Sequence, residues 1–229
     1  AGLRPLLQPV KKSDGASTKV SREHTVMEVE PGLSAIAGGK YTTYRVMAED
    51  VVDFALRRTP EAPTTKTRDI PVIGGAGYEE MRVRATALAE KYGIDEVRLE
   101  RLLFRYGSLL EDIFALMDEN PELATPLTDA PRYLRAEIVY AARSEGVLHL
   151  ADALMRRTRL DYETRDRGVS AAREVAEILA DELGWDEARR EAEIEAYSAF
   201  IAARLEAEHT TSDADAAALL ENVREIPAR

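Results

Sequence analysis

The sequence predicts a mainly α-helical protein in which a helical C-terminal domain follows a short α+β segment. Three observations lead to this fold class. Apolar residues recur at helical spacing from Met81 onward, a stretch rich in Pro, Thr and charge precedes them, and the residues before that stretch mix turns with short extended runs. We therefore divide the chain into residues 1–58, a linker at 59–71, and a helical domain at 72–229.

The first segment is predicted to contain extended stretches and turns that end in one helix. A short, imperfectly alternating β-like run surrounds Val26, and a second apolar run begins at Leu33 and meets two glycines. After Lys40, the apolar residues Met47 and Val51 recur at helical spacing. A few short strands with one helix are marginal in isolation, so we expect these strands to need partners from a sheet outside this chain.

The second segment carries a succession of helix signals. Apolar periodicity ends at Gly93 and again at Gly107, and each glycine suits the C-terminal end of a helix. Ser108 and Glu111 have the spacing of a capping box, and Pro131 suits the first turn of a further helix. Later helices are expected at about 147–157, 168–183, 186–208 and 212–223, with Asp186 and Ser212 as N-caps and Gly184 as a stop.

Composition and charge exclude several classes of function. The chain has 229 residues, is 45% hydrophobic and contains no cysteine, which excludes disulfides and thiolate chemistry. Residues 1–58 hold nine Lys/Arg and seven Asp/Glu, a net of +2, whereas residues 59–229 hold 22 and 35, a net of −13. An acidic domain argues against nucleic acid as a partner, because phosphates need a basic face. No apolar run approaches the roughly 18 residues of a membrane span.

The glycine turn before the first helix is the strongest candidate for a binding site. Gly38 and Gly39 let the backbone turn sharply and approach a ligand, and the following helix N-terminus favours an electron-rich group. Lys40 adds a positive charge there, while Thr42 and Thr43 add hydroxyl donors. From spacing alone, a plain strand–turn–helix connection explains this pattern at least as well.

The residue string at this turn resembles a known family. Gly-Gly-Lys-x-Thr-Thr-Tyr-Arg at 38–45, followed by Met-Ala-Glu, is similar to the segment that closes the FAD-binding domain of respiratory, FAD-dependent glycerol-3-phosphate dehydrogenase. Further similar strings keep the family's order and lie at 1–6, 21–26, 73–76, 105–108, 136–138 and 153–158. The family's N-terminal Gly-x-Gly-x-x-Gly unit does not occur in this chain. We therefore expect a C-terminal part of a longer flavoenzyme, inactive by itself.

The resemblance implies a reaction and a set of site residues. Glycerol 3-phosphate would be oxidised to dihydroxyacetone phosphate, with electrons passing through FAD to quinone. The substrate phosphate would be bound by Arg4, Arg22 and Lys40, because guanidinium groups grip phosphate with paired hydrogen bonds. The implied cofactor-binding residues are Gly38, Gly39, Lys40, Tyr41 and Thr42. No residue is identified as catalytic.

The same resemblance implies partners and a location. The main partner would be the N-terminal FAD domain of the same protein, in the cytoplasm, with peripheral contact at the inner face of the cell membrane. The resemblance leaves undecided whether the protein forms a homodimer. Two alternatives to the dehydrogenase also remain: a glycerophosphate oxidase that uses oxygen as the electron acceptor, and a helical interaction module without catalysis.

The remaining polar residues are expected to be structural. The three histidines, at positions 24, 149 and 209, are isolated from one another, so no metal site is predicted. For His24, which lies within the string at 21–26, a structural hydrogen bond is favoured over acid/base work. Glu137 is expected to form an internal ion pair or to cap Arg156 and Arg157. The basic cluster at 156–159 is expected to be solvated surface, with contact to lipid head groups as the alternative.

Overall fold

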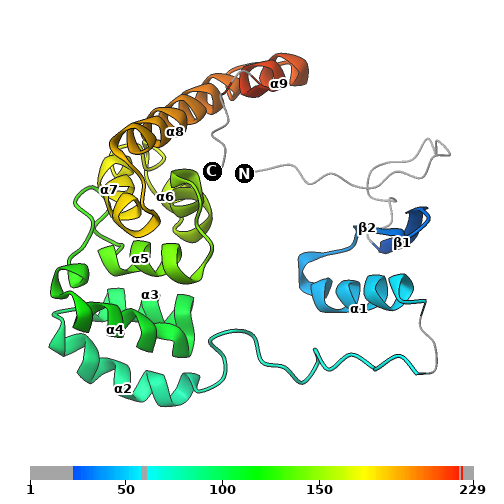
Figure 1. Cartoon of the computed structure of the whole chain (residues 1–229), viewed down its shortest axis with the longest axis horizontal. Coiled ribbons are helices and arrows are strands. Elements are labelled where there is room, and N and C mark those ends of the chain that lie inside the picture. The colour runs from blue at the N-terminus through cyan, green and yellow to red at the C-terminus, as the bar shows by residue number, and fades with distance from the viewer. Residues whose placement is uncertain (1–22, 58–60, 222, 224–229) are drawn as a thin grey trace. The chain divides into compact units, whose positions relative to one another are not determined.

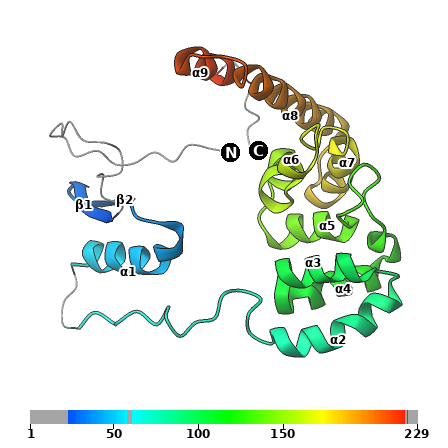
Figure 2. The ribbon, with the colours of Figure 1, turned by 180° about the vertical axis from the view of Figure 1, so that it is seen from behind.

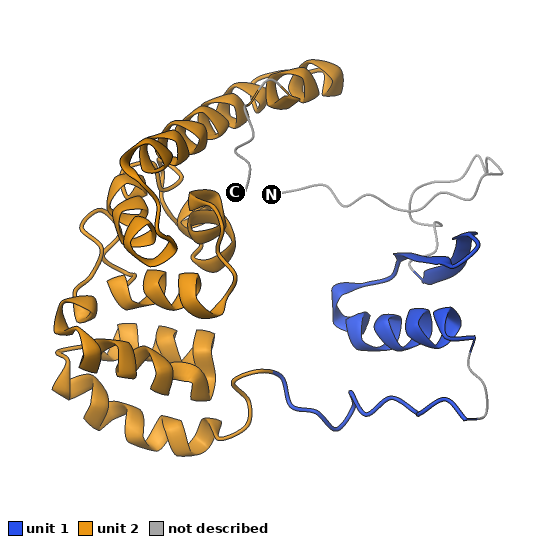
Figure 3. Ribbon diagram, in the orientation of Figure 1, with its two compact units in different colours: residues 1–72 blue, residues 73–229 orange. Residues whose placement is uncertain are grey.

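The computed structural model describes residues 23–57, 61–221 and 223. Its contacts divide the chain into two compact units, residues 1–72 and residues 73–229 (Figure 3). We describe each unit by itself. Arg4 and Arg22, predicted to bind the substrate phosphate, lie outside the described residues.

The N-terminal unit is a β-hairpin packed against one helix (Figure 1). Strands β1 (His24–Glu30) and β2 (Leu33–Gly38) are antiparallel, and their register pairs Val26 with Ile36. A 3₁₀ turn, η2 (Tyr41–Thr43), leads directly into α1 (Tyr44–Ala55). The predicted β-run around Val26 and the predicted helix after Lys40 are therefore confirmed.

The C-terminal unit is helical, as Figure 2 shows from behind. Its α-helices are α2 (Tyr78–Lys91), α3 (Glu96–Tyr106), α4 (Leu110–Glu119), α5 (Arg135–Ser144), α6 (Leu160–Glu163), α7 (Ala172–Leu183), α8 (Glu187–Ala207) and α9 (Asp213–Glu221). Two 3₁₀ turns, η3 (Gly107–Leu109) and η4 (Pro121–Ala124), and one π-helical turn, η5 (Asp152–Arg157), connect them. The predicted fold class, mainly α with a helical C-terminal domain after a small β segment, is confirmed.

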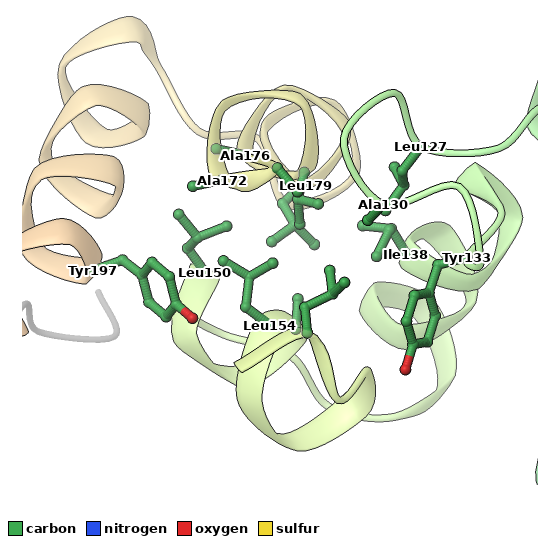
Figure 4. Close-up of a cluster of buried hydrophobic side chains, with 14 of the residues drawn as sticks. Leu127, Ala130, Tyr133, Ile138, Leu150, Leu154, Ala172, Ala176, Leu179 and Tyr197 are labelled. Carbon is green, nitrogen blue, oxygen red and sulfur yellow. The ribbon is translucent and has the colours of Figure 1, made fainter. Parts of the chain in front are cut away.

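Helix α5 lies between two hydrophobic cores. Val139 and Tyr140 pack with α2, α3 and α4, whereas Ile138 packs with residues around η5, α6, α7 and α8. Figure 4 shows the second core, in which Leu154 and Leu179 meet. A helix buried on two sides must carry apolar residues around most of its circumference, and α5 does so. This helix therefore holds the two halves of the unit together.

A close backbone crossing fixes the start of this unit. Ser108 N donates to the carbonyl oxygen of Gly74 at 2.9 Å. A Cβ added to Gly74 would stand 2.5 Å from Tyr106 O, and one added to Gly107 would stand 2.2 Å from Gly74 O. Only glycine fits at both positions, so the strings at 73–76 and 105–108 pack directly against each other.

Several predicted helix ends are confirmed. Gly93 and Gly184, at φ +66° and +68°, follow α2 and α7 in the left-handed conformation. Asp186 caps α8 by accepting a hydrogen bond from Arg189 N at 2.7 Å, and Ser212 Oγ accepts one from Asp215 N at 3.3 Å.

Two predicted helix starts are wrong. No capping hydrogen bond from a side chain precedes α4, because the chain runs into this helix through the 3₁₀ turn η3 and the amide of Ser108 is bound to Gly74. Pro131 is not in the first turn of α5. The residues after it form a turn that pairs Leu134 with Pro126, and α5 begins only at Arg135.

Candidate functional site

The predicted glycine turn connects β2 to η2. Gly38 and Gly39 adopt φ values of +85° and +72°, which reverse the chain direction at the end of the hairpin. Thr43 Oγ1 then donates to the carbonyl oxygen of Lys40 at 2.9 Å and accepts from Lys40 N at 3.3 Å. The hydroxyl proton of Thr43 is therefore used within the turn, and its predicted role as a donor to a ligand is wrong. Thr42 remains exposed.

Gly39 has no room for a side chain. A Cβ at this position would stand 2.4 Å from Met47 Sδ and 3.2 Å from His24 Cβ. The backbone of the turn thus passes tightly between β1 and α1, and the position of Gly39 is fixed by packing as well as by its dihedral angles.

A cavity of about 690 Å³ opens at this turn. Four of the five predicted cofactor-binding residues line it, namely Gly38, Gly39, Lys40 and Tyr41, and its other lining residues are Ile36, Tyr44, Met47, Ala48 and Val51. Apolar and aromatic side chains thus form most of the wall, while Lys40 supplies a positive charge. Within the part of the chain that the structure describes, no carboxylate lies within 4 Å of Lys40 Nζ. These residues fit a planar aromatic group that carries or develops negative charge.

The sequence did not reveal the whole wall of this cavity. Tyr44, Met47 and Val51 lie one helical turn apart on α1, so their spacing did indicate that they share one face. It did not indicate that this face remains uncovered. The ring of Tyr41 is 92% exposed, and its centroid lies 6.2 Å from that of Tyr44.

His24 lies behind the turn and joins β1 to α1. Its Nε2 atom is 2.6 Å from Asp50 Oδ2. This contact gives His24 a structural role, as favoured from the sequence, and it also fixes the orientation of the imidazole ring. The two residues are 26 positions apart, so no local pattern indicated their contact.

Glu137 forms the internal ion pair expected of it, and its partner is Arg101. Arg101 Nη1 donates to Glu137 Oε1 at 2.8 Å, and Arg101 Nη2 donates to Oε2. The expected contacts with Arg156 and Arg157 are absent, because Arg156 pairs with Asp152 and Arg157 Nε donates to a backbone carbonyl.

The described residues contain neither a cluster of metal ligands nor a membrane-spanning helix. Within residues 23–57, 61–221 and 223, no three His, Cys, Asp or Glu side chains cluster as metal ligands would. Over the same residues, the helices are too short or too polar to cross a bilayer.

Comparison with protein families gives a match that covers more than half of the chain. Residues 65–190 match the family described as the C-terminal domain of alpha-glycerophosphate oxidase. The chain belongs to this family. The match begins in the segment before α2 and ends in α8, so membership in the alpha-glycerophosphate oxidase C-terminal domain family rests on the helical unit.

Curated relatives extend the similarity to the N-terminal unit. The chain is 44% identical over 218 residues to glycerol-3-phosphate dehydrogenase 2 of Mycobacterium tuberculosis, and 43% identical to glycerol-3-phosphate dehydrogenase of Mycobacterium leprae, each match covering 94% of this chain and 37% of the relative. The mitochondrial glycerol-3-phosphate dehydrogenase SDP6 of Arabidopsis thaliana is 33% identical, over 88% of this chain and 34% of the relative. The chain thus spans little more than a third of the length of these relatives.

Proposed function

We propose that this chain is the C-terminal part of an FAD-dependent glycerol-3-phosphate dehydrogenase. The whole protein oxidises glycerol 3-phosphate to dihydroxyacetone phosphate and passes the electrons through FAD to quinone. The cavity at the Gly38–Tyr41 turn carries this proposal, because it joins an apolar wall, a sterically fixed glycine backbone and a positively charged Lys40 that has no carboxylate partner among the described residues. The names of the relatives support the substrate, and their greater length supports a proposal in which part of the active site lies outside this chain.

Each residue of the turn has a distinct role in this proposal. Gly38 and Gly39 allow the backbone to approach the cofactor, and Tyr41 and Thr42 offer an aromatic ring and a hydroxyl beside it. FAD supplies the acceptor for the hydride that leaves C2 of the substrate. Lys40 stabilises negative charge close to the cofactor, since a fixed cation in a partly apolar wall acts strongly on developing charge.

The substrate phosphate is a dianion that needs several cations. We assign this binding to Arg4, Arg22 and Lys40. The guanidinium groups of the two arginines each offer paired donors, and the ammonium of Lys40 offers a point charge. No residue of the chain is assigned as the base that removes the hydroxyl proton of the substrate. His24 is held by Asp50 and serves as a support of the turn.

The partners follow from the exposed surface of the N-terminal unit. Its hairpin has no third strand among the described residues, and apolar side chains such as Met27, Leu33 and Leu56 are exposed. We propose that the FAD domain of the same protein covers this surface. Electron transfer to quinone requires contact with the inner face of the cell membrane from the cytoplasmic side. Formation of hydrogen peroxide by the full-length enzyme would indicate oxygen as the acceptor instead.

Substitution of Lys40 in the full-length enzyme tests the proposal. Lys40→Met should slow flavin reduction about ten-fold at saturating glycerol 3-phosphate and lower the flavin's reduction potential, because the positive charge near the cofactor is lost. Stopped-flow absorbance across a range of substrate concentrations measures both rate and affinity. Lys66→Met is the matched control, since Lys66 is exposed and lies outside the residues that line the cavity.

Three outcomes of this experiment are distinguishable. A slower rate at saturation supports the position of Lys40 at the flavin. A weaker affinity with an unchanged saturating rate limits Lys40 to the substrate phosphate. Wild-type rates and affinities in Lys40→Met would contradict the assignment of the turn.

A further inference from the structure

A second cavity in the C-terminal unit has a wall dominated by arginine. It has a volume of about 270 Å³ and lies between α3, the turn before α5, and the segment that joins η5 to α6. Five arginines line it, and Glu163 is the one carboxylate among its lining residues; the arginines are Arg101, Arg105, Arg132, Arg157 and Arg159. Residues 59–229 carry a net charge of −13, so a cavity lined mainly by arginine differs from the acidic character of the domain.

Neighbouring carboxylates neutralise only part of this charge. Arg101 is paired with the buried Glu137, and an Nη atom of Arg105 lies 3.4 Å from Glu145. The third ion pair joins Arg132 to Glu163 at 3.7 Å. These three carboxylates leave two of the five positive charges without compensation.

Arg157 and Arg159 carry the uncompensated charge. Arg157 Nε donates to the carbonyl oxygen of Glu145 at 2.7 Å, which uses one donor and leaves the charge unpaired. No carboxylate of the described residues lies within 4 Å of either guanidinium group. Two cations that face one cavity without an anionic partner indicate that an anion from outside completes the arrangement.

The local backbone holds these arginines in place. The π-helical turn η5 ends at Arg157, and Thr158 Oγ1 closes the turn by donating to the carbonyl oxygen of Ala153 at 2.7 Å. Short π-turns of this kind occur frequently at functional sites. Here the turn brings Arg157 and Arg159 to the same wall of the cavity.

Tyr133 forms another part of the cavity wall. Its ring packs at the edge of the second core, with the hydroxyl group directed away from the leucines (Figure 4). The hydroxyl accepts from Arg159 N at 3.1 Å and donates to Glu163 Oε2 at 3.0 Å. The guanidinium of Arg101 lies 4.6 Å from the ring centroid. The buried Tyr133 and Thr158 thus support a cavity whose rim is formed by the exposed side chains of Arg132 and Arg159.

We propose that this cavity binds the phosphate group of a small soluble phosphate monoester. The planar fork of arginine matches phosphate oxygens through paired hydrogen bonds, and two uncompensated positive charges match the dianion. The volume accommodates a phosphate with a short organic group. The inference rests on residues of the C-terminal unit alone and does not depend on the proposed oxidation of glycerol 3-phosphate.

Calorimetric titration of the 229-residue chain with inorganic phosphate tests the proposal. At constant ionic strength, phosphate should bind saturably at a site that requires Arg157 and Arg159, whereas chloride should not. Arg157→Gln and Arg159→Gln should each weaken phosphate binding about ten-fold, because each removes charge-assisted hydrogen bonds. Arg156→Gln is the matched control, since Arg156 pairs with Asp152 and does not line the cavity.

Two results would overturn the proposal. One is the absence of saturable phosphate binding beyond that of chloride, and the other is an equal loss of affinity in Arg156→Gln. Thermal melts establish that each variant is folded. If Arg157→Gln does not fold, Arg159→Gln decides the outcome, because the exposed Arg159 side chain makes no contact that the fold requires.

A phospholipid head group offers the same chemistry from a different source. Vesicles that contain phosphatidic acid should retain the chain no better than phosphatidylglycerol vesicles of equal charge. Retention on phosphatidic acid vesicles that is lost in Arg159→Gln, and that phosphate does not reverse, would contradict a soluble ligand.

Discussion

The two compact units of this chain differ in what they do with their apolar side chains. In the C-terminal unit they form two cores around α5, and all buried apolar side chains of the described residues lie between Met81 and Ile201. In the N-terminal unit, Gly39 is the one buried residue among those described, while Leu33 and Leu56 are 54% and 62% exposed.

The residues that stabilise the fold therefore lie mostly in the C-terminal unit, whereas the candidate cofactor-binding residues lie in the N-terminal unit. We expect the helical unit to fold by itself, because it buries many large aliphatic side chains and each contributes about 1.5–3 kcal/mol. The hairpin and α1 lack such a core. Their geometry depends on local contacts, namely the packing of Gly39 against Met47 and the bond between His24 and Asp50. This lack of a core is consistent with our proposal that the FAD domain covers the N-terminal unit.

The largest expected effect comes from separating the two units. Residues 73–229 expressed alone should melt cooperatively, whereas residues 1–72 alone should show no cooperative transition, since a two-stranded hairpin with one helix is marginal in water. Circular dichroism and differential scanning calorimetry measure both. A helical fragment that melts without cooperativity would contradict this difference between the two units, because its core would then depend on the N-terminal residues.

Local signals predicted most of the helices. The apolar residues of α2, α3 and α8 recur at helical spacing, and Gly93, Gly184 and Asp186 mark helix ends by rules that need only neighbouring residues. The glycine turn at 38–41 was predicted in the same way, because the string that forms it is continuous.

The features that the sequence did not predict depend on contacts between distant residues. The capping box at Ser108 failed because Gly74, 34 positions earlier, binds the amide that begins the turn. The partner of Glu137 is 36 positions away, and no helical periodicity indicates it. Arg156 and Arg159 are exposed, as expected of a solvated surface, but the sequence did not indicate that Arg157 and Arg159 share a cavity with Arg101 and Arg105.

Removal of the buried carboxylate of Glu137 should have the second largest effect. This residue lies in the helical unit. Glu137 is 1% exposed, pairs with Arg101, and accepts from Tyr106 Oη at 3.0 Å and from Leu134 N at 2.9 Å. Burial, and next the charge of Glu137, raise the pKa of Tyr106, so its hydroxyl remains a donor. Glu137→Ala leaves these groups unsatisfied and should cost about 3–5 kcal/mol of unfolding free energy.

The control for this substitution is an exposed pair in the same unit. Glu79 lies 2.8 Å from Arg82, and the two side chains are 71% and 55% exposed. Glu79→Ala should leave the midpoint of urea denaturation almost unchanged, because water and salt screen an exposed pair. Urea denaturation of both variants measures the difference. Equal losses would show that burial of the ion pair does not set its contribution.

The smallest expected effect is a pH dependence in the turn between α6 and α7. Partial burial acts to raise the pKa of Asp166, but hydrogen bonds from the side chain and backbone of Ser170, and then from Thr164 and Gly168, lower it to about 2. The carboxylate accepts from Ser170 N at 2.7 Å and from Gly168 N at 3.2 Å. Because the pKa is lower in the folded state than the ordinary aspartate value of 3.8, ionised Asp166 stabilises the fold above pH 4.

This stabilisation should disappear as the pH falls from about 4 to 2, where the folded state also takes up the proton. Asp166 is exposed, so solvent screening reduces its contribution to about 1 kcal/mol. Asp166→Asn should therefore be about 1 kcal/mol less stable than the wild type at pH 6, and most of this difference should be gone at pH 2, where about half of the folded molecules have taken up the proton. Urea denaturation of both proteins at several pH values measures the difference between their unfolding free energies. The other carboxylates titrate in both proteins, so their contribution cancels in this difference. A stability difference that stays constant in acid would mean that the charge of Asp166 does not stabilise the turn.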